Sequence, residues 1–444
     1  MQKLLNAVDK HRQLILNAER YIWANPETGY KEYKTSKFMA ESFERLGYKL
    51  NYADGITGFY TTIDTGKAGP TLLILGELDS VICPNHPESD KQTGAVHSCG
   101  HNAQCAALLG IAAALKEEGA LEGLSGKIKL CAVPAEELLE IEYRSELIKK
   151  GVIKYYGGKS EFLYRGYFDD VDIAFMVHTT GAPTFRSVKA AVGCLAKKII
   201  YKGVASHAGG SPWNGKNALY AATNGLNAAN ALRETFQEKD LIRFHPIITK
   251  GGDMVNAIPE TVTIESYVRG ANFEGIANAN KRINQALCGA ALSIGCNVEI
   301  QDFPGYAPHI NSVGMTDVAE EAAKLAIPEE EYLRTDNFNT GSTDMGDLSA
   351  IMPVIHPYAA GATGTGHGAD YYIVDPERAC VKSAKWQLGM IKILLSNDAA
   401  RAKEIIENFK PRFESKDAFL SYCDSLNDSG DRITYTDGKA EIRI

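Results

Sequence analysis

The sequence has no long apolar run. Among its 444 residues, no stretch of about 18 is continuously apolar, so no transmembrane helix is predicted. The first residues lead into an amphipathic stretch and lack the uninterrupted apolar core of a signal peptide. The nine cysteines show no pairing pattern, and a chain of this length can build its core without disulfides. We therefore expect a cytoplasmic protein with reduced thiols.

The chain also lacks an excess of positive charge. Its 47 Lys and Arg residues are outnumbered by 55 Asp and Glu residues, which gives a net charge of -8. This balance argues against nucleic acid as a partner, and no membrane partner is expected either. Internal repeats and low-complexity tracts are absent. The composition, 45% hydrophobic and 23% charged, is typical of a globular protein.

Apolar, strand-like runs alternate with helical patterns in the first part of the chain. The runs cover residues 71–75, 128–133 and 173–177, and an Ala/Leu-rich helix is predicted over about 102–117. This alternation indicates an α/β domain with a mostly parallel, buried sheet. In such sheets, ligands gather where strands end and loops begin.

The pattern changes from about residue 192. The elements then read strand, helix, two strands, helix and strand, at 195–201, 217–235, 241–249, 261–268, 273–294 and 298–303. This is the βαββαβ order of a ferredoxin-like domain. Because the α/β style returns near residue 310, we predict a discontinuous domain, residues 1–191 and 308–444, interrupted by a second domain, residues 192–307. Residues 397–444 carry no chemistry that the sequence identifies.

A cysteine and a histidine stand two residues apart just before the helix at 102–117. In an extended segment this spacing puts Cys99 and His101 on one face, and Gly100 lets the backbone approach closely. A free cysteine alone is more often a small core residue. Thiol, imidazole and carboxylates together, however, are the donors of a hydrolytic metal site. His97 shares this face, and we expect it to be a hydrogen-bonded support, because another imidazole would crowd the site.

Two adjacent glutamates follow the apolar run 128–134. Such pairs are common on surfaces, but an unpaired carboxylate at the end of a buried strand is costly. Glu136 and Glu137 diverge from the strand end, so we expect them to have different roles. One can bind metal while the other takes a proton from the attacking water.

Further candidate residues for the metal site stand singly at other strand ends and in loops. His178 ends the run 173–177, where a lone histidine is as often structural as functional. His367 lies among the glycines of residues 363–370. A phosphate-binding loop is disfavoured there because no strand-to-helix context surrounds it, and a loop that brings an imidazole to a metal is preferred. Asp79 could orient a metal-bound histidine or cap a turn, and Asp344 is equally ambiguous.

These segments resemble those of the co-catalytic metallo-amidohydrolases and metallopeptidases. That superfamily includes aminoacylases, indole-acetyl-amino-acid hydrolases and p-aminobenzoyl-glutamate hydrolases. The specific segments are Cys99-Gly100-His101 and residues 134–137, and the resemblance runs from residues 25–27 to His367. Within the superfamily, residues 77–79 and 342–347 look most like the aminobenzoyl-glutamate utilisation group.

The resemblance implies a zinc-peptidase-like catalytic domain interrupted by a ferredoxin-like lid and dimerisation domain. It implies two divalent metal ions per subunit, zinc or manganese, bridged by the thiolate of Cys99. The implied ligands are Cys99, His101, Glu137, His178 and His367. Glu136 would be the general base. In a homodimer or a higher homo-oligomer, His207 would stabilise the oxyanion in the partner's active site, while Asn256 and Arg269 would hold a substrate carboxylate. Without the resemblance, these last three residues read as two turn residues and a surface arginine.

Two positions depart from the family pattern. Asn102 stands where many relatives have Asp, so the surroundings of the metal ligands are expected to differ. Glu77 stands where peptidase relatives carry a metal-binding histidine, which favours the amidohydrolase branch over the dipeptidases.

We therefore expect a metal-dependent amidohydrolase that uses metal-bound water to cleave the amide bond of an N-acyl amino acid or an aminobenzoyl-glutamate-like compound. The alternatives are a dipeptidase or carboxypeptidase of the same superfamily, a non-catalytic, metal-free binding protein, and a thiol hydrolase that uses Cys99 with His101. The last is disfavoured because the two side chains are too close in sequence to align easily as nucleophile and base. The sequence leaves open the acyl group, the metal and the need for a second type of subunit.

Overall fold

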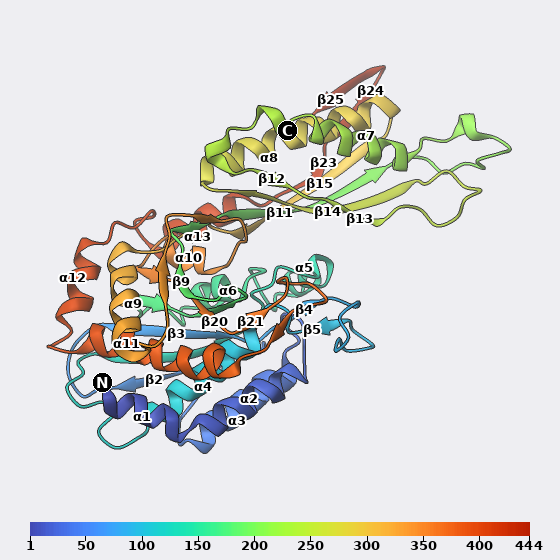
Figure 1. Cartoon of the computed structure of the whole chain (residues 1–444). Helices are drawn as coiled ribbons and strands as arrows, with labels where there is room; N and C mark the ends of the chain where they lie inside the picture. The colour runs from blue at the N-terminus through green and yellow to red at the C-terminus, as the bar shows by residue number, and fades with distance from the viewer. The chain divides into compact units, whose positions relative to one another are not determined.

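The structure is a computed structural model that describes all 444 residues. The chain forms two compact units, which Figure 1 draws in one view. Unit 1 comprises Met1–Ala190, His309–Asn337 and Thr343–Lys416, and unit 2 comprises Ala191–Pro308, Phe338–Ser342 and Asp417–Ile444. None of the helices combines the length and the apolar character that a membrane span requires.

Unit 1 is built on a six-stranded sheet in the order β1-β2-β6-β3-β7-β19. Its strands are β1 (Asn51–Tyr52), β2 (Phe59–Asp64), β3 (Thr71–Glu77), β6 (Lys127–Val133), β7 (Ile173–Phe175) and β19 (Val354–Ile355). The last four run parallel to one another, while β2 pairs antiparallel with both β1 and β6. Every residue of β3 is buried, as expected for a central parallel strand. The predicted α/β class with a mostly parallel sheet is confirmed.

The helix α4 (His101–Leu115) lies at the centre of unit 1. All of its residues are buried, because small alanine side chains let it pack closely on β3 and on neighbouring helices. Figure 1 shows α1 (Gln2–Lys10), α2 (Arg12–Trp23) and α4 together on one side of β2 and β3. The remaining helices of unit 1 are α3 (Tyr33–Arg45), α5 (Ile141–Lys149), α6 (Gly158–Tyr164), α9 (Val313–Ala326), α10 (Met345–Ser349), α11 (Ser383–Leu395) and α12 (Ala400–Asn408).

Unit 2 contains the predicted βαββαβ order. Its elements are β11 (Gly193–Lys202), α7 (Ala218–Asn230), β12 (Arg243–Phe244), β13 (Ile247–Lys250), β14 (Thr261–Gly270), α8 (Phe273–Ile294) and β15 (Asn297–Tyr306). Burial alternates along β14 and β15, since α7 and α8 cover one face of the antiparallel sheet. The sheet order β12-β14-β11-β15, with β13 also on β14, is ferredoxin-like.

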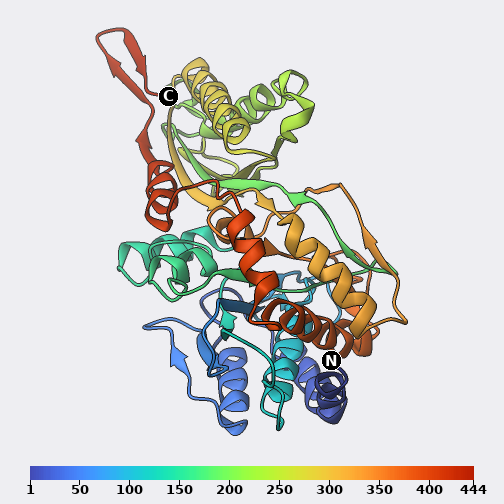
Figure 2. The same ribbon diagram turned by 90° about the vertical axis from the view of Figure 1, so that its left-hand side faces the viewer.

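The C-terminal segment adds a strand to the sheet of unit 2. After α13 (Lys416–Ser425), β23 (Asp428–Asp431) pairs antiparallel with β15. The buried Arg432 anchors this strand, because its guanidinium donates to Asp428 (2.6 Å) and to the carbonyl of Ile300 (3.1 Å). The hairpin of β24 (Ile433–Thr436) and β25 (Lys439–Ile442), red in Figure 2, projects beyond the helices of unit 2.

This arrangement differs from the expected assignment of all residues 308–444 to the first domain. Residues 417–444 pack with the ferredoxin-like elements, and so do residues 338–342. The reason is strand pairing between β23 and β15, a long-range contact that hydrophobic periodicity does not encode.

Candidate metal centre

The parallel strands of unit 1 bring the predicted segments to one edge of the sheet. β3 ends at Glu77, and residues 134–137 follow β6 directly. α4 begins at His101, and His178 opens β8 (His178–Thr180) shortly after β7. Because the carboxyl ends of parallel strands meet at one edge, side chains far apart in sequence converge there.

The Cys99 thiol lies at the centre of this convergence. Its Sγ is 3.3 Å from Nε2 of His178. The donor atoms of Cys99, His101 and His178 all lie within 4.8 Å of one another, and the same holds for Cys99, Glu137 and His367. The structure thus brings together all five residues predicted as ligands, with Cys99 common to both groups.

Only a glycine fits between Cys99 and His101. Gly100 has a φ of +91°, and a Cβ at this position would overlap the hydroxyl groups of Thr179 and Tyr371. The turn that places both side chains at the site therefore depends on Gly100.

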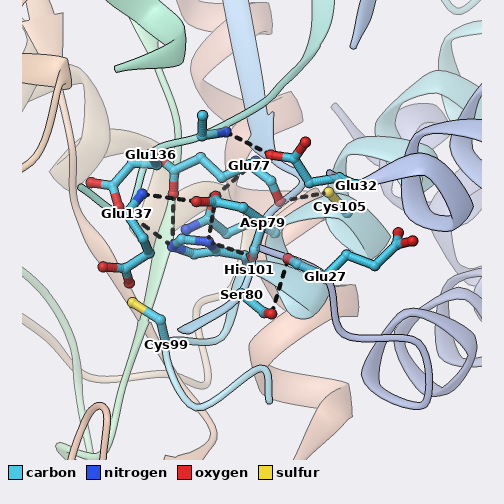
Figure 3. A network of polar contacts seen from close by, with 12 residues as sticks. Glu27, Glu32, Glu77, Asp79, Ser80, Cys99, His101, Cys105, Glu136 and Glu137 are labelled. Atoms are coloured by element: carbon cyan, nitrogen blue, oxygen red, sulfur yellow. Dashed lines mark hydrogen bonds and ion pairs between the residues drawn. The ribbon is translucent and has the colours of Figure 1, made fainter. Parts of the chain in front are cut away.

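Asp79 fixes the ring of His101. The ring nitrogen Nδ1 lies 2.9 Å from the backbone oxygen of Asp79 and 3.3 Å from its Oδ1. A ring nitrogen between two oxygens carries a proton, so Nε2 is the nitrogen directed at the site. It lies 3.2 Å from Oε2 of Glu77 and 3.9 Å from Oε2 of Glu136. Figure 3 shows these three carboxylates turned toward His101, and the Asp79 contact is the one that an orienting carboxylate makes.

Glu136 and Glu137 follow a left-handed turn and face different surroundings. Ala135 has a φ of +57°, and its N–H donates to Oε1 of Glu32 (2.8 Å). The N–H of Glu137 donates to Oδ2 of Asp79 (2.8 Å). The Glu137 carboxylate then reaches His367, with 3.0 Å between Oε1 and Nε2. The turn thus sends the two buried carboxyl groups in different directions, as the sequence predicts.

The pKa values of these two carboxyl groups are displaced in opposite directions. Burial opposes the ionisation of Glu137, but the charge of His367 outweighs it and lowers the pKa to about 2. Burial raises the pKa of Glu136 well above its usual value, and the charges of Glu77 and Glu137 raise it further. One carboxyl group is therefore held ionised, while its neighbour keeps a high affinity for a proton.

The thiol and the loop histidine are also perturbed. Burial and Glu137 oppose the ionisation of Cys99, but the imidazoles of His101 and His178 outweigh them and lower its pKa to about 6. The thiolate is the form that binds metal. The charge of Glu137 raises the pKa of His367 to about 11. His367 has a φ of +63°, and its N–H donates to the carbonyl of Ser98 (2.8 Å), which holds the loop 363–370 at the site.

The donor set suits divalent cations. Thiolate, imidazole and carboxylate are the ligands that zinc and its neighbours take from proteins. Two buried atoms at the site, Oε2 of Glu77 and Nε2 of His101, make no hydrogen bond. Buried polar atoms normally have a partner, so a cation between them would satisfy both. The residues therefore fit the predicted metal ions.

Lys159 is a residue of the site that the sequence does not reveal, and the structure also defines the surroundings of Asp344, His97 and Asn102. Lys159 is fully buried, and its ammonium group contacts Glu77 and the ambiguous Asp344. His97 was expected to be hydrogen-bonded, yet neither ring nitrogen has a hydrogen-bond partner, and burial lowers its pKa to about 3.

The side chain of Asn102 donates to Oε1 of Glu19 (2.8 Å). A buried lysine leaves no signal in composition or periodicity, so no sequence pattern could have revealed Lys159.

In unit 2, the side chain of His207 lies in an exposed turn. Its Nδ1 accepts the backbone N–H groups of Gly209 (3.1 Å) and Gly210 (2.8 Å). The exposed Asn256 is beside this turn, because its carbonyl accepts the N–H of Ala208 (2.9 Å). His207 and Asn256, to which the family resemblance gives different roles, are thus neighbours.

Arg269 lies near the end of β14, also in unit 2. Its guanidinium donates to Nε2 of His245 (3.0 Å) and to Oγ of Ser342 (2.9 Å). Burial and the charge of Arg269 lower the pKa of His245, which keeps the imidazole neutral. His245 is thus a neighbour of Arg269 that no sequence motif marks.

Comparisons with known proteins also support a metal-dependent hydrolase. The sequence profile of "Peptidase family M20/M25/M40" matches residues 73–392. The chain is 31% identical over 387 residues to the human Xaa-Arg dipeptidase, covering 82% of this chain and 80% of that protein. It is 26% identical over 302 residues to one of the subunits of the Escherichia coli p-aminobenzoyl-glutamate hydrolase, covering 66% of this chain and 58% of that protein.

A solved structure shares the fold. A dinuclear metal-binding peptidase of the M20 family from Bacillus subtilis superposes with a TM-score of 0.63 at 20% identity, covering 87% of this chain and 99% of that chain. The predicted superfamily and the predicted metal-dependent hydrolase are confirmed. The chain belongs to peptidase family M20/M25/M40, a family of metal-dependent hydrolases.

Proposed function

We propose that this protein hydrolyses the amide bond of an N-acyl amino acid or an aminobenzoyl-glutamate-like compound, with two divalent ions held by the five predicted ligands. The observation that carries the proposal is the pair of donor groups that share Cys99. A shared thiolate is suited to a two-ion centre. The adjacent glutamates, one held ionised and the other with a raised pKa, supply a ligand and a proton acceptor.

In this proposal, Glu136 moves the proton. When bound, the ions would polarise the amide carbonyl and lower the pKa of the attacking water. Glu136 accepts the proton of that water and then passes it to the leaving amine, and its raised pKa suits both steps. Asp79 holds the proton on Nδ1 of His101, so that Nε2 stays available as a donor atom.

Residues of unit 2 would complete the site from the partner subunit of a homodimer. Because Nδ1 of His207 accepts two backbone N–H groups, a neutral His207 carries its proton on Nε2 and can donate it to an oxyanion. Arg269 and Asn256 would bind the carboxylate of the amino-acid portion, for which paired guanidinium donors are suited.

Apolar residues on unit 2 support a homodimer. Trp213, Ile247 and Val255 are 78%, 62% and 101% exposed. These side chains offer apolar area that a second chain could cover. The nine free cysteines are consistent with a reducing, cytoplasmic compartment.

The test is metal content by elemental analysis, on protein purified without chelator. We expect about two divalent ions per chain in the wild type, since a shared thiolate is typical of a two-ion site, and their loss in C99A. Hydrolysis of a panel of N-acyl amino acids and aroyl-glutamates should follow the metal content. A wild type that stays free of metal after incubation with zinc or manganese would refute the proposal and favour a binding protein.

A second candidate is a dipeptidase, as the 31% identity to the Xaa-Arg dipeptidase suggests. The same panel should therefore contain unblocked dipeptides with a C-terminal arginine. Faster hydrolysis of these than of N-acyl amino acids would favour the dipeptidase. Activity of the purified chain alone would argue against the need for a second type of subunit.

A further inference from the structure

A buried lysine bridges two carboxylates at the edge of the metal centre. Lys159, Glu77 and Asp344 all have fully buried side chains. The ammonium group of Lys159 contacts Oε1 of Glu77 and Oδ1 of Asp344. The backbone N–H of Lys159 donates to the other oxygen of Asp344, Oδ2, at 2.9 Å. Lys159 is thus fixed at both its backbone and its side chain.

The start of α6 is tied to the segment that carries Glu136. The N–H of Gly158 donates to the carbonyl of Ala135 (3.2 Å). A Cβ on Gly158 would overlap the carbonyl oxygen of Pro134, so this close approach requires glycine. Lys159 therefore extends from a backbone that is held against the catalytic segment, and its ammonium has little freedom to move.

Lys159 occupies only one oxygen of Glu77. The other oxygen, Oε2, is buried, makes no hydrogen bond and lies 3.2 Å from Nε2 of His101. Donor atoms of Glu77, His101 and Glu136 lie within 4.8 Å of one another, which forms a third donor group beside the two that share Cys99. The free oxygen of Glu77 therefore faces the same nitrogen that the metal centre uses.

We propose that Glu77 is a further ligand of the metal centre and that Lys159 is the positioning residue that aims its free oxygen. This inference rests on the proposed metal assignment. With Oε1 held by the ammonium group, the carboxylate cannot rotate Oε2 away from His101. Residues that orient a ligating carboxylate in this way typically contribute about 10- to 100-fold to metal affinity.

The alternative is a buried ion pair with a purely structural role. Removing one member of any buried pair leaves an uncompensated charge and destabilises a protein. Loss of stability in K159M would therefore not distinguish the two explanations. Metal affinity, and its dependence on Glu77, would distinguish them.

The chain offers a matched control in unit 2. Lys197 is also fully buried, its ammonium contacts Asp302, and it donates to Oδ1 of Asn284 (2.6 Å). K197M removes the same type of buried ion pair from a sheet that contains none of the proposed ligands. It should lower stability and leave the affinity for metal unchanged.

The experiment measures the Zn2+ and Mn2+ affinity of the apo full-length chain by competition with a chromophoric chelator. We expect E77Q and K159M each to weaken binding about 10- to 100-fold. The double variant E77Q/K159M should be no weaker than E77Q alone, because Lys159 acts through Glu77. Wild-type affinity in E77Q, or a K159M effect that persists in full in the E77Q background, would overturn the proposal.

Two further comparisons keep the result decisive. If K159M does not fold, E77Q and D344N can be compared, since each leaves Lys159 with one carboxylate. E77Q should weaken binding more than D344N, and the reverse order would contradict the proposal. If the wild type binds no metal at all, the proposed function fails. If the wild type binds metal, C99A does not and E77Q binds metal normally, only the inference about Glu77 and Lys159 fails.

Discussion

Replacing each of the two adjacent glutamates by glutamine should change the stability of the apo protein in opposite directions. E136Q removes a buried carboxyl group whose pKa is raised by burial and by Glu77 and Glu137. E137Q removes one whose pKa is lowered to about 2 because His367 outweighs the effect of burial. The two substitutions are equally conservative in shape and lie next to each other, so each is the control for the other.

The signs follow from linkage between ionisation and folding. A carboxyl group with a raised pKa costs nothing below its unfolded pKa, about 4.5, and destabilises the folded state increasingly above it. The free energy of unfolding of E136Q should therefore rise relative to that of the wild type as pH rises from 5, by at most about 1.4 kcal/mol per pH unit. The contribution of Glu137 is present above pH 4.5 and is lost as pH falls toward 2. The His367 side chain is 54% exposed, so solvent screens its interaction with Glu137. E137Q should therefore lower the free energy of unfolding by only about 1–2 kcal/mol at pH 7.

The assay is urea unfolding of both variants and the wild type with chelator present, between pH 5 and pH 8. Activity of the metal-loaded proteins is measured in parallel. E136Q should lose about 10²- to 10⁴-fold in kcat while retaining its metal, as expected for a general base. Equal destabilisation by both substitutions, or an E136Q variant that keeps wild-type activity, would refute the reasoning.

Three further substitutions test other parts of the structure. G100A should lower the free energy of unfolding by about 2–4 kcal/mol, because it places a Cβ against two hydroxyl groups at a positive φ; an unchanged urea midpoint would contradict this. R269K should raise KM about tenfold with a smaller change in kcat, since lysine lacks the paired donors; equal KM values would remove Arg269 from substrate binding. H207A should be inactive alone, but mixing it with E136Q in equal amounts should restore about a quarter of wild-type activity, because half of the dimers are mixed and each has one complete site. No recovery after subunit exchange would place His207 outside the partner's site.

The sequence predicts the architecture of unit 1 well because its signals are local. The run at 71–75 is apolar at every position after the first, so a buried parallel strand is the natural interpretation, and β3 confirms it. The candidate donors Cys99, His101 and Glu137 could be predicted because they lie shortly after a strand or near the start of a helix, and the carboxyl ends of parallel strands converge. The structure adds the distances that make them one site.

Other features depend on contacts that no local pattern encodes. Lys159 follows two glycines in a segment of mixed composition, and only the position of α6 shows that its ammonium is buried between Glu77 and Asp344. His97 was expected to be hydrogen-bonded, but whether an imidazole finds a partner depends on the side chains packed around it. The strand β23 was missed because residues 428–431 are polar and become a strand only by pairing with β15.

That added strand has a consequence for assembly. A ferredoxin-like sheet with both outer strands open can pair with another chain at each side, and repeated pairing of that kind produces a filament. Here β23 lies along β15, and Arg432 fastens it in place. The side formed by β12 and β13 remains open to another chain. On the β15 side, β23 is then the outer strand, and as a strand of four residues with an aspartate at each end it discourages pairing with a further chain, so the C-terminal segment makes this edge less open to growth.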